Sequence, residues 1–169
     1  MTVPEGWRCC SLGSLVSTMR NGYVCKQSRS GEGYPISRIE TISQGVIDLN
    51  AVGYADIPLP EREKFKLQIG DILLSHINSL KHIGKSALYK EDFDLYHGMN
   101  LMLLRAKKGK ITPEYLHSLL TTTDARSHFR RFAKQAINQA SLNKQDISQL
   151  EVLLPPLPEQ KKIAAILSS

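Results

Sequence analysis

The sequence predicts an α+β fold in which a bent mixed or antiparallel sheet carries long loops and a few helices. Three observations support this prediction. Short apolar runs typical of strands lie mostly before residue 106. Turn-rich stretches separate them at residues 27–33, 53–60 and 78–84. Apolar residues at helical spacing follow mainly after residue 112, so most helices come after most strands.

The strands are predicted from runs of β-branched and aliphatic residues. We expect them at residues 36–42, 71–77, 85–89, 101–105 and 151–154. With 169 residues, 41% of them hydrophobic, the chain is long enough to bury one ordinary core. A single domain over residues 1–154 is therefore the expected organisation.

Helices within this domain are predicted from their caps. Thr112 can cap a helical region at residues 113–136, which we expect to divide into two helices near residue 123. A shorter helix is expected at residues 144–150, because Asn143 and Asp146 have the spacing of a capping box.

A last helix is predicted at the C-terminal end. Pro158 suits the first helical turn, and the carboxylate of Glu159 is favoured there by the helix dipole. Ile163, Ile166 and Leu167 then form an apolar stripe at helical spacing. We expect residues 155–169 to be the truncated start of a longer helix whose stripe packs against a partner helix, another copy of the chain included.

The charge distribution favours a polyanionic partner. The formal net charge is +6 and the sequence pI is about 9.3. Residues 95–112 and 125–145 contain nine lysines and arginines and no acid, whereas acids gather at residues 61–63 and 91–94. Such an asymmetry indicates a nucleic-acid-binding face rather than a uniformly solvated surface.

Compartment and catalytic class follow from what the sequence lacks. The sequence has no signal peptide and no apolar run of membrane-spanning length, so we expect a cytoplasmic protein without a membrane partner. Its three cysteines are an odd number, so we expect no disulfide framework. Gly84-Lys85-Ser86 resembles the end of a phosphate-binding loop, but Ser79 occupies the position of the first glycine. No metal-ligand spacing and no nucleophile motif occurs either, so we expect no metal site and no catalysis.

Several short motifs occur in an order that resembles a known family. Along the chain they are PEGW at 4–7, LG at 12–13, YPISRI at 34–39, GDILLS at 70–75, IGKSA at 83–87, QASL at 139–142, DI at 146–147 and PPLPEQKKIA at 155–164. Together they resemble the specificity (S) subunits of type I restriction-modification systems. The last motif is similar to the junction between a target recognition domain and the long conserved helix of that family.

The resemblance implies a non-catalytic domain that recognises one half of a bipartite site in double-stranded DNA. A complete S subunit has two such domains, separated by antiparallel helices that recruit adenine-N6 methyltransferase (M) subunits, and a restriction (R) subunit joins for cleavage. S-adenosylmethionine, ATP and Mg²⁺ belong to these partners, so no cofactor is expected in this chain. Both a shortened chain and a half-size subunit that dimerises are compatible with one domain, and the interrupted helix favours the former.

Candidate DNA-binding residues come from polar loops and from acid-free basic segments. Each of these loops is also compatible with an ordinary solvated turn, and the resemblance favours DNA contact because loops between core strands carry it in that family. Arginines and lysines of the predicted helix at 123–136 suit phosphates, whereas loop amides and hydroxyls suit base edges. The candidates are Lys26, Arg29, Ser30, Arg38, Ser75, Asn78, Ser79, Lys81, Lys85, Arg126, Arg130, Arg131, Lys134, Asn138, Gln139 and Ser141.

Two other functions stay open at this stage. A DNA-recognition domain detached from a single-chain DNA methyltransferase would have a similar fold, although the PPLPEQ junction argues against it. A non-catalytic protein-interaction module would explain the terminal apolar stripe but not the acid-free basic segments.

Overall fold

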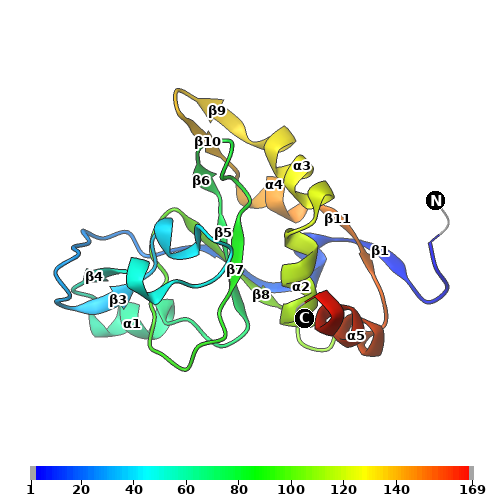
Figure 1. Cartoon of the computed structure of the whole chain (residues 1–169), viewed down its shortest axis with the longest axis horizontal. Helices are drawn as coiled ribbons and strands as arrows, with labels where there is room; N and C mark the ends of the chain where they lie inside the picture. The colour runs from blue at the N-terminus through cyan, green and yellow to red at the C-terminus, as the bar shows by residue number, and fades with distance from the viewer. Residues whose placement is uncertain (1–2, 168–169) are drawn as a thin grey trace.

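The computed structural model describes residues 3–167 and has an α+β fold with a four-stranded antiparallel sheet at its centre (Figure 1). The strand order is β2-β8-β5-β7. These strands span Val16–Asn21 (β2), Leu101–Ala106 (β8), Asp71–Ser75 (β5) and Ser86–Leu88 (β7). All residues of β5 are buried, which requires cover on both faces of the sheet.

Two hydrophobic clusters provide that cover. Successive side chains of a strand point to opposite faces. Ile72 and Leu74 of β5 therefore lie in the larger cluster, with the helices, whereas Leu73 lies in a second cluster with Leu101 and Leu103. The short apolar run of the GDILLS segment is thus a strand at the centre of the core.

Helices cover the first face. They are α2 (Pro113–Leu120), α3 (Thr123–Phe132), α4 (Lys144–Ser148) and α5 (Leu157–Leu167). Thr112 caps α2 by accepting a hydrogen bond from the Tyr115 backbone N–H, and Asn143 and Asp146 form the expected capping box at α4. These local predictions are confirmed.

A separate two-stranded sheet joins the two ends of the domain. Strand β1 (Arg8–Ser11) pairs antiparallel with β11 (Glu151–Leu154), and both termini of the described chain lie on the helical side of the molecule (Figure 1). Helix α5 follows β11 directly. Its Ile163 packs against the larger core cluster, while Ile166 and Leu167 are 73% and 67% exposed. Residues 168 and 169 of the expected terminal segment lie outside the described residues.

Shorter elements cover the second face. Strand β3 (Tyr34–Ile36) pairs with β4 (Gly53–Ala55), and helix α1 (Leu59–Phe65) follows. Single 3₁₀ turns of this layer occur at Glu40–Ile42 (η2) and Leu49–Ala51 (η3), whereas the turn at Leu12–Leu15 (η1) packs in the cluster on the helical side. In Figure 1 this layer lies opposite the helices across the central sheet.

The last sheet has three strands and projects from the rest of the molecule (Figure 1). It contains β6 (Ile77–Asn78), β10 (Gln139–Ser141) and β9 (Lys134–Ala136), in that order. Strand β10 pairs with both neighbours, and the β9–β10 hairpin extends away from the core at the top of the view in Figure 1.

Some expectations need correction. The fold class is confirmed, but the strands form four small antiparallel sheets rather than one bent sheet. The expected strand at 36–42 ends at Ile36, because Thr41 Oγ1 accepts from the Arg38 N–H and bends the chain into η2. Strands β1 and β2 were not predicted, and α1 occupies part of an expected loop. Residues 113–120 and 123–132 form the two expected helices, but 134–136 form a strand.

Candidate nucleic-acid interface

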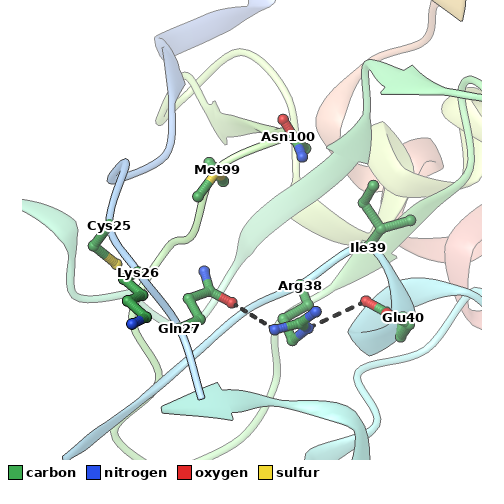
Figure 2. A pocket seen from close by; sticks show the side chains of 8 residues that line it. All are labelled: Cys25, Lys26, Gln27, Arg38, Ile39, Glu40, Met99 and Asn100. Atoms are coloured by element: carbon green, nitrogen blue, oxygen red, sulfur yellow. Dashed lines mark hydrogen bonds and ion pairs between the residues drawn. The ribbon is translucent and has the colours of Figure 1, made fainter. Parts of the chain in front are cut away.

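One surface cavity lies between the loop after β2 and the η2 turn (Figure 2). It has a volume of about 560 Å³. Its lining residues are Cys25, Lys26, Gln27, Arg38, Ile39, Glu40, Met99 and Asn100. Asn100 has a left-handed backbone (φ 68°), which asparagine tolerates better than most residues. Met99 and Asn100 lie across the cavity from Gln27 and Arg38 (Figure 2).

A chain of polar contacts fixes one wall of this cavity. The Arg38 Nη1 donates to Gln27 Oε1 at 3.3 Å, and its Nε pairs with Glu40 Oε2 at 3.4 Å (Figure 2). Arg29 also pairs with Glu40, at 3.2 Å. Burial alone would raise the pKa of Glu40, but its own backbone N–H and the charges of Arg38 and Arg29 together lower it. The two arginines and this ionised carboxylate therefore carry a net positive charge.

These contacts also orient the amide of Gln27. Because its oxygen accepts from Arg38, its Nε2 is left as the group that can donate. Space for this amide depends on Gly98, where a Cβ would lie 3.0 Å from Gln27 Nε2 and would collide with the Ser37 carbonyl oxygen.

A second cavity adjoins the first and shares Ile39 and Glu40 with it. Its volume is about 180 Å³, and its other lining residues are Ile42, Ser43, Ser75, Asn78, His82 and Lys85. The Lys85 Nζ donates to the Ser43 carbonyl at 2.8 Å, so this ammonium group is already held in place. Partial burial and the charges of Lys85 and Lys81 lower the pKa of His82, as expected where positive charge gathers.

The loop at residues 75–85 is tightly folded rather than loose. The backbone N–H of Gly84 donates to the Ser75 carbonyl, and that of Ser75 donates to the Lys85 carbonyl. Asn78 Nδ2 donates to Ser75 Oγ at 3.0 Å, and Asn78 Oδ1 accepts from the Ser79 N–H at 2.8 Å. The loop therefore presents its polar groups from fixed positions.

A third cavity lies on the other side of the segment 75–78. Ser75 and Asn78 line the second cavity, whereas His76 and Ile77 line the third. The third has a volume of about 490 Å³ and is also lined by Asn21, Met102, Lys134, Ser141, Leu142, Asn143 and Lys144. Burial lowers the pKa of His76 to about 4, so its imidazole is neutral at pH 7.

Basic side chains line all three cavities, of which the first two share residues and the third lies across the segment 75–78. Among their described lining residues the cations are Lys26, Arg38, Lys85, Lys134 and Lys144, and Glu40 is the one acid. Because Glu40 is already paired with two arginines, the surface as a whole is positively charged. It suits a polyanion that also offers hydrogen-bonding groups.

Seven of the sixteen predicted residues line this surface. They are Lys26, Arg38, Ser75, Asn78, Lys85, Lys134 and Ser141. Asn138 and Gln139 are exposed on the β9–β10 hairpin, and Ser79 and Lys81 lie in the turn that follows β6. Ser30 is exposed in the loop after β2, where its Oγ lies 2.8 Å from Ser28 Oγ.

The three arginines of α3 lie outside the three cavities. Burial and the charge of Arg130 lower the pKa of the half-buried Arg126, and Arg131 lies over the Phe132 ring at 5.5 Å. Arg130 and Arg131 are exposed, and phosphate contact by this helix stays a prediction.

Other lining residues were not predicted. They include Gln27, Asn100, Asn143 and Lys144. Gln27 lies between the predicted residues Lys26 and Arg29, so the polar composition of that loop could have indicated it. Asn100 carried none, because it reaches the first cavity only through the pairing of distant segments.

Two further kinds of site are absent from the described residues. Within 3–167, no group of three or more His, Cys, Asp or Glu side chains is arranged to hold a metal ion. None of the helices in this range has the length and apolar character needed to cross a membrane.

Comparison with known proteins gives consistent relatives. The family model described as "Type I restriction modification DNA specificity domain" matches residues 4–169. A type I restriction enzyme MjaX specificity subunit of Methanocaldococcus jannaschii is 49% identical over 98% of this chain, and the match spans 40% of that protein. The EcoKI specificity subunit of Escherichia coli is 34% identical over 89% of this chain and 33% of its own length.

The fold has counterparts among solved structures. A chain from a structural study of the assembly and conformational transition of the type I R-M system superposes with a TM-score of 0.74. It is 19% identical, and the match covers 99% of this chain and 39% of that one. The chain thus spans 33–40% of the length of these relatives. By the extent of the family match, the chain belongs to the type I restriction-modification DNA specificity domain family.

Proposed function

We propose that this chain recognises sequence in double-stranded DNA, as one half of a bipartite target, and has no catalytic activity of its own. The observation that carries the proposal is the basic lining of the three cavities, with fixed polar loops between them. Membership of the specificity family supports it and favours a specificity subunit over a domain detached from a single-chain methyltransferase.

Two sets of residues have different roles in this proposal. Lysines and arginines around the cavities and on α3 contact phosphates, which fix the position of the duplex without reading its sequence. Asn78, Ser79, Lys81 and Gln139 present side-chain donors and acceptors from the loop after β6 and from the hairpin, and these contact base edges.

Partners complete the proposed activity. Methyltransferase subunits modify adenine at the recognised site, and a restriction subunit cleaves, with S-adenosylmethionine, ATP and Mg²⁺ bound by those partners. Helix α5 is the proposed attachment point, through its Ile163, Ile166 and Leu167. Since Ile163 already packs on the core of the domain, the exposed Leu167 carries more of the contact with a partner helix, or with a second copy in weak self-association.

Binding of duplex DNA over a salt series tests the proposal. The chain alone should bind weakly, in the micromolar range or above, with a steep salt dependence because phosphate contacts dominate non-specific affinity. Replacing both Lys134 and Lys144 by alanine should reduce the slope of log K against log salt by about 1.8, or about 0.9 per phosphate contact.

The matched control replaces Lys161 and Lys162, two exposed lysines of α5 that lie outside the three cavities. This variant should keep the wild-type slope. Equal slopes for both double variants, or no binding by the wild-type chain at low salt, would remove the DNA-binding surface as described.

Base-reading residues are tested by the methylation sites of the assembled enzyme. Replacing Asn78 or Gln139 by alanine should relax the methylated motif at one base pair, because a lost base contact costs about 1–3 kcal/mol at that position. Non-specific affinity should hardly change. If the variants methylate the same base sequence as the parent enzyme, with no relaxed position, these loops do not read DNA.

A further inference from the structure

The tip of the β9–β10 hairpin carries an unusual side chain. Ile137 is 94% exposed, the highest value among the large hydrophobic residues of the described chain. It lies in the two-residue loop between Ala136 and Gln139, beside Asn138, whose left-handed backbone (φ 58°) closes the turn. Asparagine suits such a turn, and nothing in the turn requires an isoleucine beside it. Neither the turn nor the core therefore explains an isoleucine at this position.

The base of the hairpin is fixed, so its tip has a defined position. Ala140 of β10 is buried, and the strand pairs with β9 on one side and β6 on the other. The Leu142 backbone N–H donates to the His76 carbonyl at 2.8 Å, which holds the end of β10 against the wall of the third cavity. In Figure 1 the hairpin extends beyond this attachment, away from the core.

The surroundings of the tip favour approach to DNA. Residues 134–139 are all exposed and include Lys134, Gln135 and Gln139, and no acid occurs between residues 125 and 145. A two-stranded β-ribbon fits the major groove, which is about 12 Å wide. A basic hairpin with polar sides and an apolar tip is therefore shaped for the major groove.

The chemistry of that groove selects one contact for an aliphatic tip. Base edges in the major groove present hydrogen-bond donors and acceptors, and the C5-methyl group of thymine is their apolar group. An isoleucine placed against the other edges would remove water from polar atoms without replacing the hydrogen bonds. We infer that Ile137 is a specificity determinant that packs against the methyl group of one thymine in the recognised half-site. This inference rests on the proposed DNA-binding function.

Replacement of thymine by uracil isolates this contact, because uracil lacks the methyl group and keeps the same hydrogen-bonding pattern. The half-site is first obtained by selecting random duplexes with the wild-type chain, and each thymine is then replaced in turn. At one thymine the replacement should weaken binding by the wild-type chain about fourfold, the effect expected for burying one methyl group. Ile137→Ala should bind the two duplexes equally, and Ile137→Val should retain part of the difference.

The control variant is Ile69→Ala, which removes another exposed isoleucine, 68% accessible, that lines none of the three cavities. It should keep the thymine preference of the wild type. If the wild-type chain selects a motif but no thymine in it depends on residue 137, the inference fails and the proposed function stands. If Ile137→Ala weakens assembly with a methyltransferase subunit and leaves the thymine preference intact, the tip is a protein contact and the inference also fails. If the wild-type chain binds no duplex, both are refuted.

Discussion

Replacing Gln160 by alanine should strongly destabilise the chain, although the residue lies in the first turns of a surface helix. Its side chain is 1% exposed and makes three hydrogen bonds. The Oε1 accepts from the Thr112 backbone N–H at 2.9 Å, and the Nε2 donates to the carbonyls of Lys110 and Pro155 at 3.0 and 2.9 Å. The amide thus connects α5 to the segment that leads into α2.

The magnitude follows from these contacts. Each hydrogen bond contributes about 0.5–1.5 kcal/mol net, and buried backbone groups left without a partner cost more, so the free energy of unfolding should fall by about 2–4 kcal/mol. For a chain of this size, about 2–4 °C of melting temperature accompanies each kcal/mol, which gives a decrease of roughly 4–16 °C. Gln160→Glu should cost at least as much, because a carboxylate cannot donate to the two carbonyls.

Urea denaturation followed by tryptophan fluorescence is a suitable assay. Trp7 is the single tryptophan of the chain, and its Nε1 donates to Glu159 Oε2 at 2.9 Å, so it lies beside the affected helix. Gln149→Ala is the matched control, since this exposed glutamine should change stability by less than about 0.5 kcal/mol. A loss below about 0.5 kcal/mol in Gln160→Ala would refute the view that this amide holds α5 in place.

Three further predictions concern the core and the basic helix. Asp71 is buried and accepts two hydrogen bonds from Arg105, at 2.7 and 2.9 Å. Arg105→Ala should therefore reduce the free energy of unfolding by about 2–3 kcal/mol in urea titrations, less than for a fully buried pair because the Arg105 side chain is 29% exposed. Burial lowers the pKa of both His76 and His97 to about 4. As the pH falls, the unfolded chain, whose histidines have a pKa of about 6.5, therefore binds protons before the folded chain does. The free energy of unfolding should fall between about pH 6.5 and about pH 4, by about 1.4 kcal/mol per pH unit for each histidine. A His97→Asn variant whose urea midpoint falls as steeply as that of the wild type would contradict this assignment. Arg130→Ala should weaken binding to all duplex sequences alike and lower the salt slope by about one unit, which anisotropy on unrelated duplexes can check.

Local signals in the sequence predicted the helices after residue 112 but not α1. Caps act over three or four residues, so Thr112 and the Asn143–Asp146 pair could be identified without knowledge of the fold, and the structure confirms both. The buried strand at 71–75 was equally clear from its continuous apolar run. The β1–β11 sheet was not, because Cys9 pairs with Leu153, a partner far away in the sequence that no local pattern specifies.

The candidate site was predictable only in part for the same reason. Loop composition indicated Lys26 and Asn78, and Arg38 was a candidate from the expected strand at 36–42; all three line cavities. It could not show that Arg38 would be held between Gln27 and Glu40, since these contacts depend on how two loops meet. Nor could a charge pattern along α3 reveal that its arginines lie outside the cavities.

The segment at residues 75–78 has a consequence for how a base sequence would be read. Its outer residues, Ser75 and Asn78, line the second cavity, and its inner residues, His76 and Ile77, line the third. A substitution on one side will therefore shift the backbone that supports the other side. Base preferences at the two positions served by these cavities should be energetically coupled, so that changes made on both sides depart from the sum of the separate effects. An altered target specificity built one position at a time would have to be selected for both positions together.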